Sequence, residues 1–142
     1  MLYLATLRGG TITRPLELSA TLTLPPSTNS MYRAFGGRII LSSAYRRWKA
    51  SVALATREQV AACGGFGSAL VEVDIDAVFK TRRSDLDNVA KPVIDALAAA
   101  GWVGNDNQVI AIRLRKVGYS MTRPEVFVTM RPSKMTPAKL QR

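Results

Sequence analysis

The chain has 142 residues, 47% of them hydrophobic, and a formal net charge of +10. This length suits one domain with a real core, and no apolar run approaches the roughly 20 residues of a membrane span. The absence of histidine excludes Ser-His, Cys-His and His-zinc chemistry, while the single cysteine, Cys63, excludes an internal disulfide or a Cys-based zinc site. The first ten residues lack the features of a signal peptide, so we expect a cytoplasmic protein without a membrane partner.

The first half of the chain predicts one strand and one helix. Residues 18–24, "LSATLTL", alternate as in a strand, "PPSTNS" breaks the strand, and "MYRAFGGR" continues as a loop or a short hairpin. A helix is expected from a cap at Ser42 or Ser43 to about Ala62. Its apolar face comprises Tyr45, Trp48, Val52 and Ala55.

The second half predicts three strands and a second helix. Residues 69–79 alternate strictly, which places Glu72, Asp74 and Asp76 on a solvated face where nearby Arg side chains can pair with them. Residues 84–100 are expected to be helical, with Ser84 as a cap and with Pro92 as a break or kink. Residues 108–117 and 124–130 are expected to form an antiparallel strand pair.

These elements follow the order β-α-β-α-β-β, which predicts a single α/β (α+β) domain with a mixed sheet and two main helices. We expect residues 1–17 to be an N-terminal extension, 18–131 to be the domain, and 132–142 to be a basic, frayed tail.

Charge is distributed unevenly along this order. Seven of the ten acidic residues lie between Glu72 and Asp106, whereas both ends of the chain are rich in Lys and Arg. A basic surface around an acidic centre attracts polyanions. A generally basic, solvated surface explains the composition equally well.

Two carboxylates, Asp85 and Asp87, open the second expected helix. Acids in a first turn favour the helix dipole, and a D-x-D pair also suits Mg²⁺, which prefers carboxylate oxygens. Lys91 follows one turn later, either as a catalytic cation or in an i,i+4 salt bridge, for which Asp95 is the expected partner. Spacing alone leaves both interpretations open.

The surrounding block, "RRSDLDNVAKPVIDALAAAGWVGNDNQV", resembles the signature of the RusA family of Holliday junction resolvases. The shared features are a basic run, D-L-D-N, a Lys three residues after the Asn, D-A-L, a glycine-containing loop and an acid before Q-V. "LPPSTNSMYR", residues 24–33, is similar to the family's P-P-S-x-N loop. The resemblance covers about residues 20–117.

This resemblance implies a RusA-like fold with Asp85, Asp87 and Asp106 as metal-binding acids and Lys91 as the catalytic lysine. It implies hydrolysis that depends on Mg²⁺, with Mn²⁺ as an alternative. The substrate would be the four-way (Holliday) DNA junction of recombination and repair, cut by a homodimer through paired nicks. A metal suits a chain without histidine, because bound metal lowers the pKa of water.

Basic and aromatic residues supply candidate contacts to branched DNA. Tyr32 and Phe35 can stack on unpaired bases, whereas Trp48 is expected in the core. The basic candidates are Arg33, Arg38, Arg46, Arg47, Arg82 and Arg83. Two alternatives stay open: a DNA-binding accessory protein without catalysis, and a metal nuclease that prefers forks, flaps or linear duplex.

The distance between the acids raises a further hypothesis. A helix over residues 86–100 is about 22 Å long, and residues 101–106 return at most about 20 Å. Asp106 therefore reaches its own Asp85 with difficulty unless Pro92 shortens the helix. In a two-fold dimer, Asp85, Asp87 and Lys91 of one subunit would instead meet Asp106 of the partner.

Overall fold

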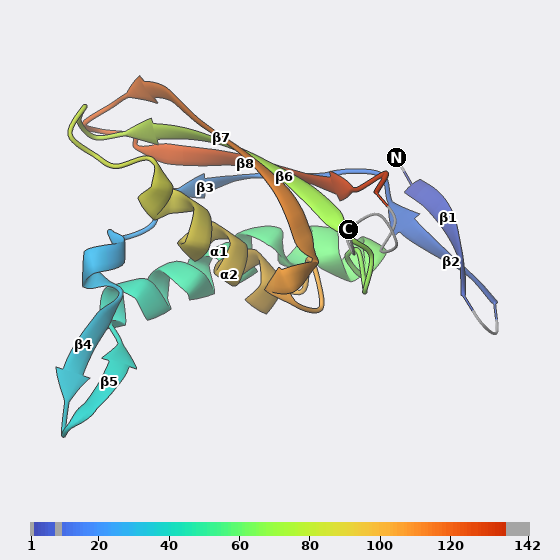
Figure 1. Ribbon diagram of the computed structural model, residues 1–142, viewed down its shortest axis with the longest axis horizontal. Coiled ribbons are helices and arrows are strands. Elements are labelled where there is room, and N and C mark those ends of the chain that lie inside the picture. Colours follow the sequence, from blue (N-terminus) through green and yellow to red (C-terminus); the bar gives the residue numbers. More distant parts are fainter. Residues whose placement is uncertain (1, 8–9, 136–142) are drawn as a thin grey trace.

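The computed structural model describes residues 2–7 and 10–135. A four-stranded mixed sheet carries two helices on one face, and two hairpins stand apart from it (Figure 1). The strands are β1 (Leu2–Leu7), β2 (Gly10–Pro15), β3 (Leu18–Thr23), β4 (Tyr32–Phe35), β5 (Arg38–Leu41), β6 (Val71–Phe79), β7 (Val109–Tyr119) and β8 (Glu125–Pro132), and the helices are α1 (Ser43–Cys63) and α2 (Ala90–Ala99). Over the described ranges, neither helix combines the length and hydropathy needed to cross a bilayer. The expected α/β class and single domain are confirmed.

The sheet order is β3-β8-β6-β7, with β6 parallel to β7 and antiparallel to β8. The expected antiparallel pairing of the last two strands is therefore wrong, because β6 lies between them. The chain leaves β7, crosses the end of β6 and enters β8 on its other side. At this crossing the Ser120 N–H donates to the Phe79 carbonyl at 2.7 Å.

The alternation expected in β6 is confirmed. Its buried side chains, Val71, Val73, Ile75, Ala77 and Phe79, face the helices and join the core. On the opposite side Arg131 lies 2.8 Å from Asp74, and Arg115 lies 2.7 Å from Asp76. The hydrogen bond from Arg131 lowers the pKa of Asp74. These strand acids are therefore neutralised by arginines of the adjacent strands.

Helix α1 begins as the sequence indicates. The Ser42 hydroxyl accepts from the Tyr45 N–H at 3.2 Å, which caps the helix. Trp48 is buried as expected, and its indole N–H donates to the Thr23 carbonyl at 2.9 Å. Thr56 takes the buried position expected for Ala55 and satisfies its hydroxyl on the Val52 carbonyl. The helix ends at Gly64, whose φ is 71°.

Both ends of the chain carry structure that the pattern did not indicate. Strands β1 and β2 pair with each other within the expected N-terminal extension. Strand β8 runs to Pro132, and the Ser133 N–H donates to the Leu70 carbonyl at 2.8 Å, so the start of the expected tail belongs to the sheet. The rest of that tail, residues 136–142, lies outside the described residues.

Candidate functional site

The loop between β6 and α2 carries the D-L-D-N turn. Lys116 of β7 anchors this loop, since its ammonium group donates to the Ser84 carbonyl at 2.7 Å and to the Arg82 carbonyl at 3.3 Å. The same ammonium group lies 5.0 Å from the centre of the Phe79 ring. The turn is thereby held at the end of β6 by a residue of the parallel neighbouring strand.

The turn itself is a 3₁₀ segment, Asp87–Val89, and the α-helix starts only at Ala90. The expected cap at Ser84 is wrong, because Leu86 is the residue that precedes the 3₁₀ turn and no side-chain cap bond is made to the turn in the described part of the chain. Pro92 causes no break or kink, because it stands in the first turn of α2, where N–H groups have no intrahelical partner. The expected long helix is thus replaced by a short one of ten residues.

A second loop fixes the opposite side of the turn. The Thr28 hydroxyl, in the P-P-S-T-N segment, donates to the Asn88 side-chain oxygen at 2.6 Å. A hollow of about 290 Å³ forms between the two loops, and Asp85 lines it together with Ser27, Arg83 and Asn88. Asp85 therefore faces the proline-containing loop.

Asp106 is held by a polar network around Gln108, a residue that was not predicted to belong to the site. Asn105 and Gln108 form a reciprocal capping box around the 3₁₀ turn Asp106–Gln108. Gln108 is only 8% exposed, and its amide donates to the carbonyls of Gly67 and Ala69, each at 2.7 Å. The N-x-x-Q spacing was the available signal for this positioning role.

Asp87, Lys91 and Asp106 line one hollow of about 340 Å³ along the exposed side of α2. They lie along its length rather than at one point: Asp87 precedes the helix, whereas Asp106 also lines a neighbouring hollow with Ala98 and Ala99 at the helix end. The apolar part of the lining comprises Ala90, Ile94, Val109 and Ile112.

The Lys91 ammonium group lies 3.0 Å from the Asp95 carboxylate, so the expected i,i+4 pair is present. The hydrogen bond and charge of Asp95 raise the pKa of Lys91, and the charge of Asp106 adds to the effect. The lysine side chain is 64% exposed. Lys91 is therefore a fully protonated cation that lies against the helix and stays accessible to a ligand.

The expected three-carboxylate metal site does not assemble within one chain. Among residues 2–7 and 10–135, no three acidic side chains lie close enough together to hold a metal ion. Asp85 lines one hollow, while Asp87 and Asp106 line different parts of another. The oxygen donors suit a hard cation, but the described part of a single chain does not gather three of them at one point.

The neighbouring hollow, of about 450 Å³, is lined by Tyr32, Tyr45, Lys49, Asp95 and Asp106. Tyr45 is 1% exposed, and its hydroxyl has no hydrogen-bond partner in the described part of the chain. Burial, and then the charge of Asp95, raise the pKa of Tyr45 to about 12. The wall of this hollow therefore contains a buried phenol that resists ionisation.

Replacing Tyr45 with Phe is expected to leave stability unchanged or to raise it by up to about 1 kcal/mol, because a buried hydroxyl without a partner is costly. The parent should also lose stability relative to the variant above pH 10. The phenol ionises near pH 10 in the unfolded chain and near pH 12 in the folded chain. The stability that the parent protein gains from keeping this proton in the folded state is therefore fully present below pH 10 and is lost as the pH rises through 12. Urea midpoints at pH 8 and 11 measure both effects; a clear loss of stability in the variant at pH 8 would show that the hydroxyl is satisfied.

The predicted DNA-binding residues are all exposed. Arg33, Arg38, Tyr32 and Phe35 lie on the β4–β5 hairpin, Arg46 and Arg47 on α1, and Arg82 and Arg83 on the loop before Asp85. Of these, Arg83 lines the Asp85 hollow and Tyr32 lines the hollow that contains Asp106. The structure thus brings two of them to the carboxylates and leaves the others on the surrounding surface.

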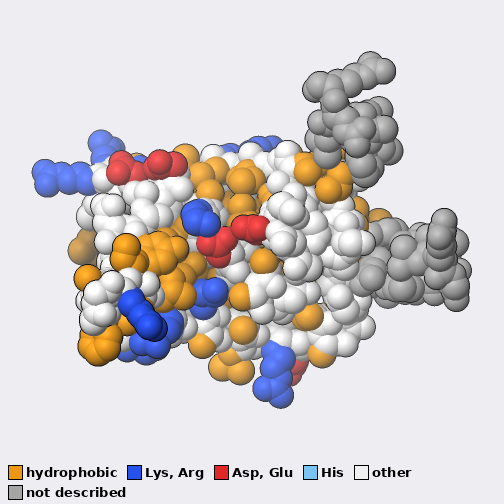
Figure 2. Space-filling view, turned by 60° about the horizontal axis from the view of Figure 1, so that its bottom comes forward, with side chains coloured by type: hydrophobic (Ala, Val, Ile, Leu, Met, Phe, Trp, Pro, Cys, Tyr) orange, Lys and Arg blue, Asp and Glu red, His pale blue; other side chains and the backbone are white. Residues whose placement is uncertain are grey.

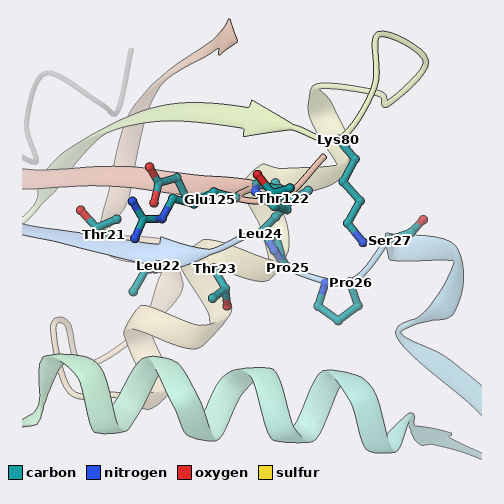
Figure 3. Close-up of a pocket in the computed structure, with 12 residues that line it drawn as sticks. Thr21, Leu22, Thr23, Leu24, Pro25, Pro26, Ser27, Lys80, Thr122 and Glu125 are labelled. Carbon is teal, nitrogen blue, oxygen red and sulfur yellow. The ribbon is translucent and has the colours of Figure 1, made fainter. Parts of the chain in front are cut away.

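A further hollow, of about 660 Å³, lies beside the end of β3 and the proline-containing loop (Figure 3). Its charged residues are Lys80, Arg123 and Glu125, and the Lys80 side chain extends toward Ser27. Ser27 also lines the hollow that contains Asp85. Lys80 therefore adds a cation beside the proline-containing loop that no local sequence pattern indicated.

Comparison with known proteins identifies the family. The profile of the endodeoxyribonuclease RusA family matches residues 23–131. The crossover junction endodeoxyribonuclease RusA of Escherichia coli (strain K12) is 32% identical over 99 residues, which cover 70% of this chain and 82% of the relative. The protein of the same name from Shigella sonnei (strain Ss046) is 37% identical over 101 residues, which cover 70% of this chain and 82% of the relative. The protein of the same name from Enterobacteria phage 82 is 32% identical over 97 residues, which cover 68% of this chain and 80% of the relative. Because the profile covers most of the chain and these relatives are at least 32% identical over about 70% of it, the chain belongs to the RusA family of endodeoxyribonucleases.

Proposed function

We propose that the chain is a structure-selective endodeoxyribonuclease that resolves four-way DNA junctions in recombination and repair. The observation that carries the proposal is the hollow lined by Asp87, Lys91 and Asp106, since it combines acidic oxygens with an accessible cation beside a basic surface. The relatives are named crossover junction endodeoxyribonucleases, which favours a branched substrate over other DNA.

In this proposal, the residues around the hollow have different roles. Exposed arginines of the hairpin, of α1 and of the loop before Asp85 bind the phosphate backbone. Lys91, protonated and exposed, lies beside the scissile phosphate and stabilises the negative charge that develops there. Asp95 positions Lys91 through their ion pair, and Gln108 positions Asp106 through its bonds to Gly67 and Ala69.

We further propose that the protein depends on Mg²⁺, with Mn²⁺ as an alternative, and acts as a homodimer that makes paired nicks. Residues 2–7 and 10–135 of one chain do not gather three carboxylates, so the cation would be held by Asp85 and Asp87 of one subunit and Asp106 of its partner. This requires the D-L-D-N turn, which directs Asp85 and Asp87 to different hollows in the single chain, to bring both carboxylates to the cation in the dimer. When bound, such a cation neutralises phosphate charge and lowers the pKa of water. Two antiparallel copies of α2 about a two-fold axis would bring these acids together, and Ile112, which lines the hollow and is 47% exposed, would be covered by the contact.

The proposal is tested by comparing four-way junction, fork and linear duplex of matched sequence, with Mg²⁺ and with a chelator. We expect paired nicks in the junction only with metal, and binding to the junction in both conditions. Affinity should fall steeply with salt, because many Lys and Arg residues displace counterions. Metal-dependent cutting of the fork in preference to the junction would support a fork nuclease, and binding without any cutting would support an accessory protein.

Mixing two inactive variants, Asp87→Asn and Asp106→Asn, tests the shared site. The heterodimer contains one doubly damaged site and one intact site if the acids come from both subunits, so single-strand nicking is expected to return. Subunit exchange is verified with tagged copies. A mixture that exchanges subunits and stays inactive would show that each site belongs to one chain.

Replacing Lys91 with Ala is expected to preserve junction binding and slow single-turnover cleavage by about a hundred-fold, within the range for loss of a charge-stabilising group. If Lys91 only pairs with Asp95, the loss is instead about 0.3–0.5 kcal/mol of stability with cleavage intact. A thermal melt beside a single-turnover assay separates the two. Lys134→Ala, which changes a lysine outside these hollows, is the matched control.

A further inference from the structure

The β4–β5 hairpin stands apart from the rest of the fold. Among residues 2–7 and 10–135, its two strands pair only with each other, from Tyr32 opposite Leu41 to Phe35 opposite Arg38. Figure 1 shows it projecting away from the four-stranded sheet, beyond the start of α1. A lone two-stranded hairpin gains little stability of its own. A contact with a binding partner would stabilise it in this exposed position.

The tip of the hairpin is narrow and carries large apolar side chains. Gly36 and Gly37 turn the chain with φ of 56° and 75°, and no other part of the described chain lies within 4 Å of a Cβ built at either position. Beside them, Phe35 is 67% exposed and Ile39 is 78% exposed. Ile39 pairs with Ala34 and Phe35 with Arg38, so each face of the tip presents one large apolar side chain to solvent.

The register sorts the hairpin into two faces. Phe35 shares one face with Arg33, two residues earlier, and with Arg38, its cross-strand partner. The Arg33 guanidinium lies 5.6 Å from the centre of the Phe35 ring. Figure 2 shows hydrophobic and basic side chains side by side at the lower left of the molecule, the end at which the hairpin lies in Figure 1. An aromatic ring flanked by two arginines is suited to bases and phosphates together.

The positive charge around the hairpin favours DNA over a protein as its binding partner. Residues 18–57 contain six Lys and Arg and no acidic residue, so the whole segment around the hairpin attracts a polyanion. The base of the hairpin also reaches the candidate site, because Tyr32 lines a hollow together with Asp106. The base of the hairpin and Asp106 are therefore close enough to contact the same DNA molecule.

We infer that the hairpin is a wedge for the branch point: Phe35 inserts between bases where the strands exchange, while Arg33 and Arg38 hold the flanking phosphates. Apolar side chains wedged between base steps unstack DNA at modest cost, and this cost is smallest where pairing is already interrupted. The inference rests on the proposed junction specificity and adds to it the element that recognises the branch.

The test uses junctions with 2-aminopurine at the branch point, without divalent metal, so that binding is separated from cutting. The parent protein is expected to raise the fluorescence by unstacking the base. Phe35→Ala should abolish this rise and weaken junction binding about ten-fold, the cost of one stacking contact, with little change on linear duplex. Phe35→Trp should restore both signals, and Phe127→Ala, which removes an exposed ring from β8, should change neither.

Three results would overturn the inference. They are an unchanged fluorescence rise in Phe35→Ala, an equal loss of junction and duplex binding, or conversion of a parental dimer to a monomer in sedimentation, which would assign the tip to a second copy of the chain. A parent that shows no preference for junctions would instead refute the proposed function, independently of Phe35.

Discussion

Replacing Asp87 with Asn is expected to reduce junction nicking by at least about a hundred-fold while junction affinity stays within a few-fold of the parent. The substitution keeps size and removes the charge that a cation needs, whereas phosphate contacts come mainly from Lys and Arg. Asp87 lines the hollow with Lys91 and Asp106 and starts a 3₁₀ turn that no side chain caps. Single-turnover nicking and equilibrium binding to the same labelled junction measure the two quantities.

Asp76→Asn is the matched control for this variant. Asp76 also lies near the D-L-D-N turn in the sequence, but it pairs with Arg115 at 2.7 Å on the open face of the sheet. The Asp76→Asn variant should therefore nick junctions at a rate close to that of the parent. A normal nicking rate in Asp87→Asn would show that Asp87 acts only as an acid at the start of the helix. An equal loss of nicking in both variants would indicate a general effect of charge on the fold.

The largest effect on stability is expected for Gly65→Ala, at about 2–5 kcal/mol of unfolding free energy. Gly65 has a φ of 68°, where an L side chain is strained, and an added Cβ would collide with the carbonyl oxygens of Gly101 and Trp102. The Phe66 N–H donates to that same Trp102 carbonyl at 2.8 Å, and the Gly104 N–H donates to the Gly67 carbonyl at 3.1 Å. The turn therefore docks the loop that leads to Asp106, and nicking should fall together with stability.

Gly118→Ala gives the control for this prediction. A Cβ at Gly118 meets no described residue within 4 Å, and the φ of Gly118 is not positive, so the change should stay within about 0.5 kcal/mol. Urea unfolding of both variants measures the difference. If the Gly65→Ala variant had the same urea midpoint as the parent, the loop would adjust to the added Cβ at little cost, and its docking would not set the position of Asp106.

Local sequence signals were sufficient for the elements whose causes are local. The strict alternation of β6 places one side of the strand in the core whatever it pairs with, and the Ser42 cap acts on a backbone N–H three residues away. The pairing of Lys91 with Asp95 follows in the same way from their spacing on one helix. The D-L-D-N block and the proline-containing loop were sufficient for the family, because both are continuous stretches of chain.

The sequence pattern was insufficient wherever the outcome depends on segments far apart in the chain. Strand β7 pairs with β6 and not with β8 because α2 returns the chain parallel to β6, which periodicity does not encode. The D-L-D-N turn begins as a 3₁₀ segment while Lys116 and Thr28 hold it from two other elements. Asp85 and Asp87, neighbours in a pattern, line different hollows. Only tertiary contacts decide where a carboxylate points, since backbone dihedrals on an irregular turn are set by the partners that satisfy its polar groups.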